Sequence, residues 1–173
     1  RREAHRGTWH GRIDALRVLA DSGVPTGAEQ VAGGLHDPDQ DVRAAAVAAL
    51  GRLGSRASVE ALVQALQEDC VAASRVATSI AVVGPTDADP VVPLLRSRDA
   101  RLRYWGVLLM QRRPAIAQLD RVLAVLTTDP NPAVRKAALW TIGQRDVSSA
   151  VEAVRQRTTD PVPYVRAHAL RTL

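Results

Sequence analysis

The residue types that usually carry catalysis are few and scattered in this 173-residue sequence. The four histidines form no H-E-x-x-H motif and no recurring histidine–carboxylate pair on a helix, so we expect no metal site built from such motifs. These histidines are His5, His10, His36 and His168. A phosphate-binding loop is not expected either, because Gly33-Gly34 lacks the G-K-[ST] continuation. The sequence therefore predicts neither a metal nor another cofactor.

The single cysteine, Cys70, excludes an intrachain disulfide and a metal site made of several cysteines. Cys70 lies near the start of an expected helix, and such a position can lower the pKa of a thiol. No surrounding motif supports a reactive thiol, however, and free cysteine is commonly buried as a small apolar side chain. We interpret Cys70 as a buried residue of this kind.

Six arginines recur in one register along the chain, at intervals of 28 to 32 residues. Three of them follow valine, in Val42-Arg43, Val134-Arg135 and Val165-Arg166. The full set is Arg12, Arg43, Arg75, Arg103, Arg135 and Arg166. Repetition with a period of about 31 residues is the signature of stacked helical repeats.

Each repeat carries signals for the start and the end of a first helix. Asp37-Pro38, Asp129-Pro130 and Asp160-Pro161 predict an N-cap carboxylate followed by a proline in the first turn, where a missing N–H has little cost. Apolar residues then follow at helical spacing. Glycines near the expected helix ends allow a left-handed stop, and they are Gly51, Gly54, Gly84 and Gly143.

A second amphipathic helix is expected in each repeat, for example at residues 57–66, 115–126 and 148–155. One pair of helices cannot bury its apolar stripes alone, so neighbouring pairs must stack. The composition agrees with this, because 46% of residues are hydrophobic but only 3% are aromatic. Small and straight-chain apolar residues favour closely packed helices.

The pattern DPxxxVRxxAAxALGxLG followed by AVxALxxAL resembles the HEAT repeat, in particular the short bacterial variety related to phycobilin-lyase repeats. The resemblance extends from about Trp9 to Leu173. It implies an all-α, right-handed α-solenoid of about five and a half helical hairpins, forming one domain over residues 1–173. The expected units are residues 8–36, 37–68, 69–97, 98–128, 129–159 and 160–173.

The third and fourth repeats depart from this pattern. Ser74-Arg75 replaces the apolar–arginine pair in the third repeat, which also lacks Asp-Pro, and the stretch before Arg103 is short. The resemblance further implies that the repeated arginines pair with aspartates of their own or the neighbouring repeat, forming a structural ladder. The aspartates available for this ladder are Asp37, Asp41, Asp69, Asp99, Asp129 and Asp160.

The resemblance also implies that the helices carrying these arginines line a concave surface. Aligning the repeats at the arginine gathers aromatic and basic residues in repeats four to six, whereas the middle repeats are smooth and apolar. The expected binding patch consists of Tyr104, Trp105, Lys136, Trp140, His168 and Arg171. Aromatic anchors beside cations suit a peptide or protein contact, or stacking on bases. Alternatively, Trp105 and Trp140 fill gaps between helices beside small residues such as Gly106.

We therefore expect a non-catalytic protein- or peptide-binding scaffold whose contact centre is Trp105 and Trp140. The alternative is a nucleic-acid-binding protein, including an enzyme similar to the HEAT-like alkylpurine DNA glycosylases, whose basic clefts carry Trp, Tyr, Asp and Arg. The patch lacks the carboxylate that such an enzyme needs. The absence of H-E-x-x-H argues against the iron-dependent hydroxylases built on HEAT repeats.

The net charge of +5 and the pI near 10.5 would also suit nucleic acid. All basic residues except Lys136 are arginines, however, which a GC-rich genome explains equally well. No apolar run approaches the roughly 18 residues of a membrane span, so a cytoplasmic location is expected. The sequence starts at Arg1 without methionine and stops within a helix at Leu173, which suggests a segment of a longer chain. A basic flank like residues 1–6 is also compatible with tethering through a membrane anchor that precedes Arg1.

Overall fold

The structure is a computed structural model that describes residues 2–22, 27–84, 89–112, 122, 125, 129–144 and 150–173. All regular elements in these residues are helices, which confirms the all-α fold. The contacts distinguish two compact units, Arg1–Pro90 and Val91–Leu173, and each is described separately below. A continuous solenoid over residues 1–173 stays a prediction. The helix expected at residues 115–126 lies outside the described residues except for Val122 and Val125.

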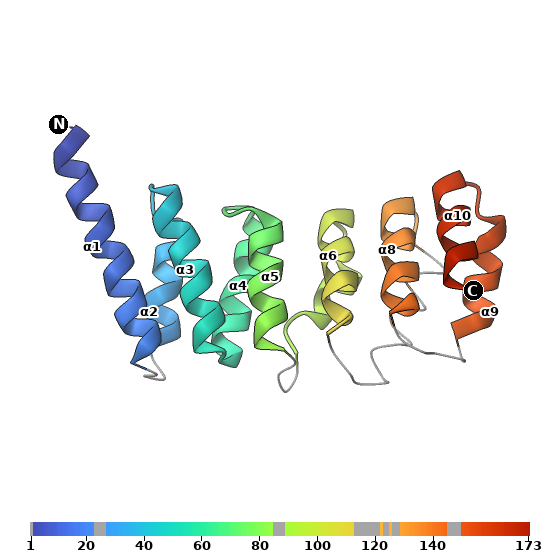
Figure 1. Cartoon of the computed structure of the whole chain (residues 1–173), viewed down its shortest axis with the longest axis horizontal. Helices are drawn as coiled ribbons and strands as arrows, with labels where there is room; N and C mark the ends of the chain where they lie inside the picture. Colours follow the sequence, from blue (N-terminus) through green and yellow to red (C-terminus); the bar gives the residue numbers. More distant parts are fainter. Residues whose placement is uncertain are drawn as a thin grey trace. The chain divides into compact units, whose positions relative to one another are not determined.

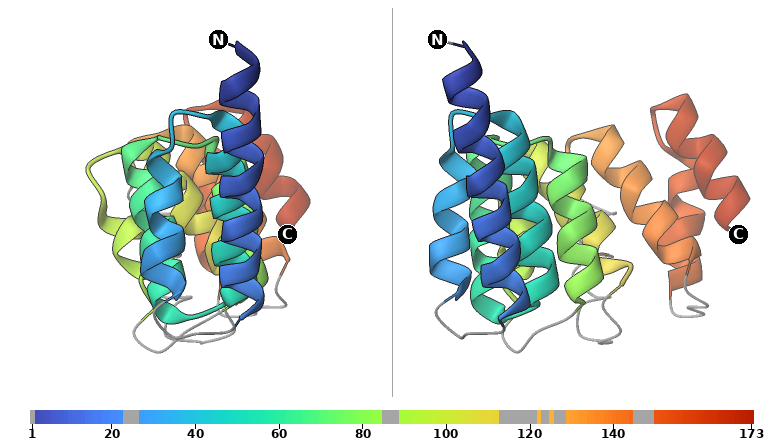
Figure 2. Two further views of the ribbon diagram at one scale, coloured as in Figure 1. Left: turned by 90° about the vertical axis from the view of Figure 1, so that its left-hand side faces the viewer. Right: turned by 60° about the vertical axis from the view of Figure 1, so that its left-hand side comes forward.

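The first unit is a double layer of helices (Figure 1). One layer contains α1 (Arg2–Asp21), α3 (Gln40–Leu53) and α5 (Ala73–Val83), which pack side by side in chain order. The second layer contains α2 (Gly27–Gly33) and α4 (Arg56–Glu68), with a short 3₁₀-helix, η1 (Gly34–His36), leading into α3. Figure 2 shows the same two layers from the side of α1. The first-layer helices are those that carry the repeated arginines.

The second unit repeats this plan. Its first layer contains α6 (Ala100–Met110), α8 (Pro132–Gly143) and α10 (Pro163–Thr172), and α8 packs against both of the others. The 3₁₀-helix η2 (Val92–Arg96) packs against α6. The helix α9 (Val151–Gln156) and the 3₁₀-helix η4 (Arg157–Thr159) pack against α10. Each unit is thus a short stack of helical hairpins.

Aliphatic side chains between the two layers form the core of each unit. Leu50, Leu62 and Ile80 are fully buried in the first unit, as are Met110 and Leu139 in the second. Burial of each such side chain contributes about 1.5–3 kcal/mol relative to leaving it exposed.

Close approach of the backbones limits the size of some side chains in the second unit. A Cβ atom at Gly106 would lie 2.9 Å from the Cβ of Leu94. Gly106 is therefore required where α6 crosses η2.

The first helix of each repeat starts later than the Asp-Pro pairs predict. Asp39 caps α3 by accepting hydrogen bonds from the N–H groups of Asp41 and Val42, and Asn131 caps α8 by accepting one from the N–H group of Ala133. The predicted N-caps Asp37, Asp129 and Asp160 are therefore wrong by two residues. Each of these carboxylates instead accepts a hydrogen bond from the N–H group of the residue two positions later. Each also accepts hydrogen bonds from an arginine of the preceding repeat.

Arg135 shows the geometry that links one repeat to the next. Its Nε and Nη2 atoms each donate to the Asp160 carboxylate at 2.8 Å, across 25 residues of sequence. Its Nη1 atom donates to the backbone carbonyls of Asp129 and Pro130 at 2.9 and 3.2 Å. One guanidinium therefore holds the start of its own repeat and the start of the following repeat.

Arg103 repeats this geometry in the second unit, and the pair of hydrogen bonds to aspartate also occurs in the first unit. Arg12 donates two hydrogen bonds to the Asp37 carboxylate, from Nε at 2.7 Å and from Nη2 at 3.0 Å. Arg103 donates from Nε and Nη2 to the Asp129 carboxylate at the same two distances. Its Nη1 atom also donates to the carbonyls of Ser97 and Arg98.

Arg43 and Arg166 donate through Nη1 to the carbonyls of the Asp-Pro pair of their own repeats. Arg75 lies exposed in the first turn of α5, in the repeat that lacks Asp-Pro.

The other three aspartates proposed for the ladder lie at or near helix ends. Asp41 is exposed in the first turn of α3. Asp69 ends α4 in the left-handed conformation. Asp99 caps α6 by accepting the Arg101 N–H at 2.7 Å. Helix capping, rather than pairing between repeats, accounts for Asp99.

Removing the guanidinium of Arg135 should destabilise the second unit strongly. Arg135 and Asp160 are 9% and 0% exposed, so Arg135→Ala leaves a buried carboxylate without its main partner. We expect the free energy of unfolding to fall by about 3 kcal/mol. Urea unfolding followed by circular dichroism measures this loss. The control Arg155→Ala removes an exposed ion pair with Glu152 in the same unit and should cost about 0.5 kcal/mol or less. Equal losses in the two variants would contradict the ladder's role.

Stability should also fall in acid because of Asp160. Burial raises the pKa of Asp160, but hydrogen bonds from Arg135 and Val162 and the nearby positive charges outweigh it, so the pKa lies below 3.8. Such a carboxylate stabilises the fold above its unfolded pKa and loses this effect as the pH falls through its folded pKa. The free energy of unfolding should therefore decrease between about pH 5 and pH 2. Unfolding measured across this range should show a shallower dependence for Asp160→Asn, and an unchanged slope would count against this account.

Candidate binding site

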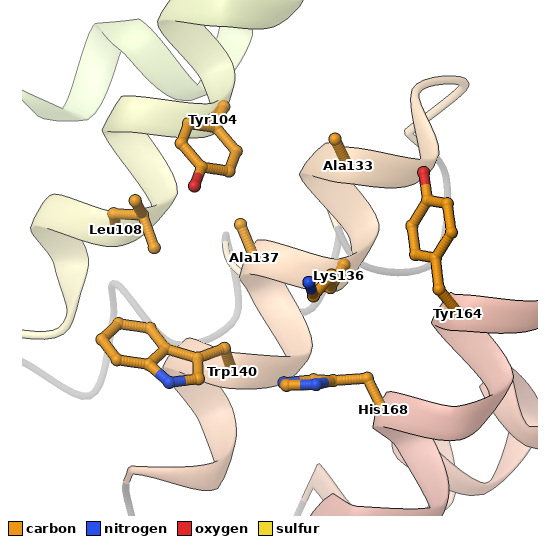
Figure 3. A pocket seen from close by; sticks show the side chains of 8 residues that line it. All are labelled: Tyr104, Leu108, Ala133, Lys136, Ala137, Trp140, Tyr164 and His168. Atoms are coloured by element: carbon orange, nitrogen blue, oxygen red, sulfur yellow. The ribbon is translucent and has the colours of Figure 1, made fainter. Parts of the chain in front are cut away.

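The first-layer helices of the second unit, α6, α8 and α10, surround a surface hollow of about 620 Å³, drawn in Figure 3. The rings of Tyr104, Trp140 and Tyr164 line this hollow, which we call the aromatic hollow. Its lining residues are Tyr104, Leu108, Ala133, Lys136, Ala137, Trp140, Tyr164 and His168.

Helical spacing places these side chains together. Tyr104 and Leu108 are four residues apart on α6, and Tyr164 and His168 are four residues apart on α10. The α8 residues lie at positions 133, 136, 137 and 140, which share one face of a helix. The opposite face of α8, including Leu139, is buried in the core. The core-facing residues therefore fix the orientation in which α8 presents the hollow.

Differences in side-chain size create the depression. Ala133 and Ala137 contribute only methyl groups along the middle of α8, whereas Tyr104 and Tyr164 rise from the helices on either side (Figure 3). Trp140 lies at one end, with the imidazole of His168 beside it in the same view. Trp140 and Tyr164 remain 38% and 47% exposed, so both rings can contact a bound molecule.

The hollow is electropositive. Lys136 extends its Nζ atom to 5.9 Å from the centroid of the Tyr164 ring, a cation–π contact. Burial lowers the pKa of His168, and the charges of Lys136 and Arg171 lower it further. None of the lining residues is an aspartate or glutamate. A carboxylate of a ligand would therefore meet positive charge without a competing acid in the lining.

The structure brings four of the six expected patch residues into the lining, namely Tyr104, Lys136, Trp140 and His168. Trp105 lies outside it, half-buried, with its ring in an edge-to-face contact with Tyr104 at 5.4 Å between centroids. Arg171 is exposed on α10 and is also absent from the lining.

The expected patch omitted four lining residues: Leu108, Ala133, Ala137 and Tyr164. Tyr164 had a usable signal in the sequence, because it precedes His168 by one helical turn.

A family model described as HEAT repeats matches residues 4–82 and 119–173 of the chain. No curated protein matches the chain. Among solved structures, the chain is similar to human deoxyhypusine hydroxylase in complex with glycerol. That match has a TM-score of 0.49 and 16% sequence identity, and it covers 93% of this chain and 77% of the hydroxylase chain. Likeness at this level carries no information on activity.

Within the described residues, no helix combines the length and the apolar character needed to cross a bilayer.

The protonation of His168 should report on the charges around the hollow. Because Lys136 and Arg171 contribute to lowering its pKa below 6.5, Lys136→Met and Arg171→Met should each raise that pKa. Titration of the His168 ring by NMR measures the change. Arg155→Met, which removes an exposed charge on α9, serves as the control and should leave the titration unchanged. If neither Lys136→Met nor Arg171→Met raises the pKa, the described electrostatics of the hollow are wrong.

Proposed function

Because the chain belongs to the HEAT-repeat family, we propose that it is a non-catalytic scaffold that binds a segment of a partner protein in the aromatic hollow. The observation that carries this proposal is the gathering of three aromatic rings and two basic side chains around one depression. Tryptophan and tyrosine dominate the energetics of protein contacts because they bury large areas with little loss of conformational entropy.

The dimensions of the hollow suit a short segment of polypeptide. A volume of about 620 Å³ lies within the range of pockets that enclose a ligand of several side chains. Ala133 and Ala137 leave space for an apolar side chain of the partner between Tyr104 and Tyr164. Trp140 would cover one side of that anchor and exclude water from it.

The charges favour an acidic segment. Lys136 lines the hollow and Arg171 lies near it, and both are positively charged at neutral pH. Burial and these two charges lower the pKa of His168, so at neutral pH its imidazole contributes a hydrogen bond rather than a charge. Like charges juxtaposed across an interface suppress wrong partners, and opposite charges speed association and fix orientation. The preferred ligand is therefore a segment in which an aspartate, a glutamate or a terminal carboxylate neighbours a large apolar residue.

The lining also supports a role without catalysis. It contains no serine, threonine, cysteine, aspartate or glutamate, so the carboxylate that glycosylase chemistry would use beside the aromatic rings is missing from it. Aromatic rings beside cations would also suit stacked bases, which makes nucleic acid the competing ligand. Three of the repeated arginines, Arg12, Arg103 and Arg135, are engaged with aspartates and offer little to phosphate.

Peptide display on the purified protein, followed by affinity measurement on the selected sequences, tests the proposal. We expect selected peptides to combine an acidic residue with an aromatic or aliphatic one. Trp140→Ala should weaken their binding roughly 10- to 30-fold, as for a central anchor residue. Lys136→Glu should weaken acidic peptides more than neutral ones.

Trp9→Ala is a matched control, because Trp9 is also partly accessible but lies on α1 in the first unit. Selected peptides that bind Trp140→Ala as tightly as the wild type would refute the site. Retention of oligonucleotides that weakens steeply with salt, with no peptide selected, would establish the nucleic-acid alternative instead.

A further inference from the structure

A second group of chemically reactive side chains lies in the first unit, far in sequence from the aromatic hollow. His36 ends η1, Glu68 ends α4, and Cys70 follows Glu68 by two residues. One imidazole nitrogen, one carboxylate oxygen and the Cys70 Sγ atom all lie within 4.8 Å of one another. Nitrogen, oxygen and sulfur donors from three consecutive repeat units thus lie close together.

The local backbone explains this convergence. Asp69 ends α4 with a φ of 56°, and it is the one non-glycine residue with positive φ in the described part of the chain. A left-handed residue at this position reverses the chain after the helix. The reversal carries Cys70 back towards the last turn of α4, where its Sγ atom donates to the carbonyl of Ala65 at 3.7 Å.

The Glu68 carboxylate is already oriented towards the histidine. Gln64 donates its amide hydrogen to Oε1 of Glu68 at 2.8 Å, one turn earlier on the same helix. The other carboxylate oxygen, Oε2, faces Nε2 of His36 at 3.7 Å. An outer hydrogen bond of this kind is typical of the carboxylates that bind metals, because it fixes the orientation of the ligand.

The distances suit a small tetrahedral ion. Bonds of about 2.0–2.3 Å to zinc place neighbouring ligand atoms roughly 3.3–3.8 Å apart in a tetrahedron. The His36–Glu68 distance of 3.7 Å already lies in this range. The limit of 4.8 Å for the whole group leaves a movement of about 1.5 Å at most, and the exposed side chains of His36 and Glu68 can supply it by rotation.

We propose that His36, Glu68 and Cys70 bind one divalent ion of the zinc class, with water as the fourth ligand. A thiolate and an imidazole select zinc, or cobalt in its place, over magnesium and calcium, which prefer oxygen ligands. Burial raises the pKa of the Cys70 thiol, as do the carboxylates of Glu68 and Asp69, whereas Arg43 lowers it, so binding of the ion must displace the thiol proton. Cys70 also lines a hollow of about 300 Å³ with Asp69, Val71 and Arg75, so water can reach the sulfur.

Titration of the tag-free, reduced full chain with Co²⁺ tests the site directly. We expect one equivalent of Co²⁺ per chain, a sulfur-to-cobalt charge-transfer band, and the visible absorption of a tetrahedral ion, all reversed by added Zn²⁺. Because Cys70 is the single cysteine, Cys70→Ser must abolish the charge-transfer band. His36→Gln and Glu68→Gln should weaken Zn²⁺ binding by roughly 10- to 100-fold or more.

The matched control is Glu60→Gln, which removes another partly exposed glutamate of α4 and should leave Zn²⁺ affinity unchanged. Circular dichroism of each variant checks that it folds. No saturable binding, one ion per two chains, or equal losses in Glu60→Gln and Glu68→Gln would overturn the proposal. Trp140→Ala should bind Zn²⁺ normally, because this site is independent of the aromatic hollow.

Discussion

The structure depends on the repeated arginine, whose guanidinium can make two kinds of hydrogen bond at once. In Arg135, Nη1 holds two backbone carbonyls at the start of its own repeat, while Nε and Nη2 hold the Asp160 carboxylate of the next. Asp160 in turn accepts the N–H group of Val162 and so fixes the bend before α10. The planar fork of arginine satisfies this geometry, and the shorter point charge of lysine cannot. A bond that fixes the start of two repeats also fixes the spacing of their helices.

The aromatic hollow is a consequence of that spacing. The repeated arginine and the residues that line the hollow share the same helices, so the ladder sets how far apart α6, α8 and α10 stand. Core residues such as Leu139 occupy the opposite face of α8. The side chains that remain, among them Trp140 and Lys136, are free of any role in packing the two layers together. They are therefore the positions at which a common scaffold can acquire a particular ligand.

The sequence predicted the helical repeats well because the arginine period is long, regular and coupled to helix-start and helix-stop signals. It misplaced the N-caps because Asp-Pro resembles a capping signal, and only the partner arginine shows that the carboxylate is already used. The aromatic hollow was predicted in part. On α6 the lining residues Tyr104 and Leu108 are one and five positions after the repeated arginine. On α10 the lining residues Tyr164 and His168 are two positions before and two after it.

Each outer helix thus presents only the edge that faces α8. Trp105 lies off this edge of α6, one residue past Tyr104, whereas Arg171 shares the face of α10 that carries Tyr164 and His168 but lies one turn beyond the lining. Alignment by columns cannot distinguish these edges, because it treats all repeats as equivalent. The His36, Glu68 and Cys70 group was beyond sequence reasoning for a different reason. Its members belong to different repeats, and the left-handed turn at Asp69 that brings Cys70 back has no glycine to announce it.

The ladder has a direction, because the three arginine–aspartate pairs that join repeats in the described residues all run from an arginine to an aspartate of the following repeat. Arg12 to Asp37, Arg103 to Asp129 and Arg135 to Asp160 all follow this rule. A repeat that has both the arginine and the aspartate can therefore donate hydrogen bonds to the following repeat and accept them from the preceding one. A gene encoding such repeats can lengthen by duplicating a whole repeat, since the new arginine–aspartate contacts are the same as the existing ones. Diversity in this architecture can then arise in the number of repeats and in the few exposed positions of each, while the arginine–aspartate contact itself stays constant.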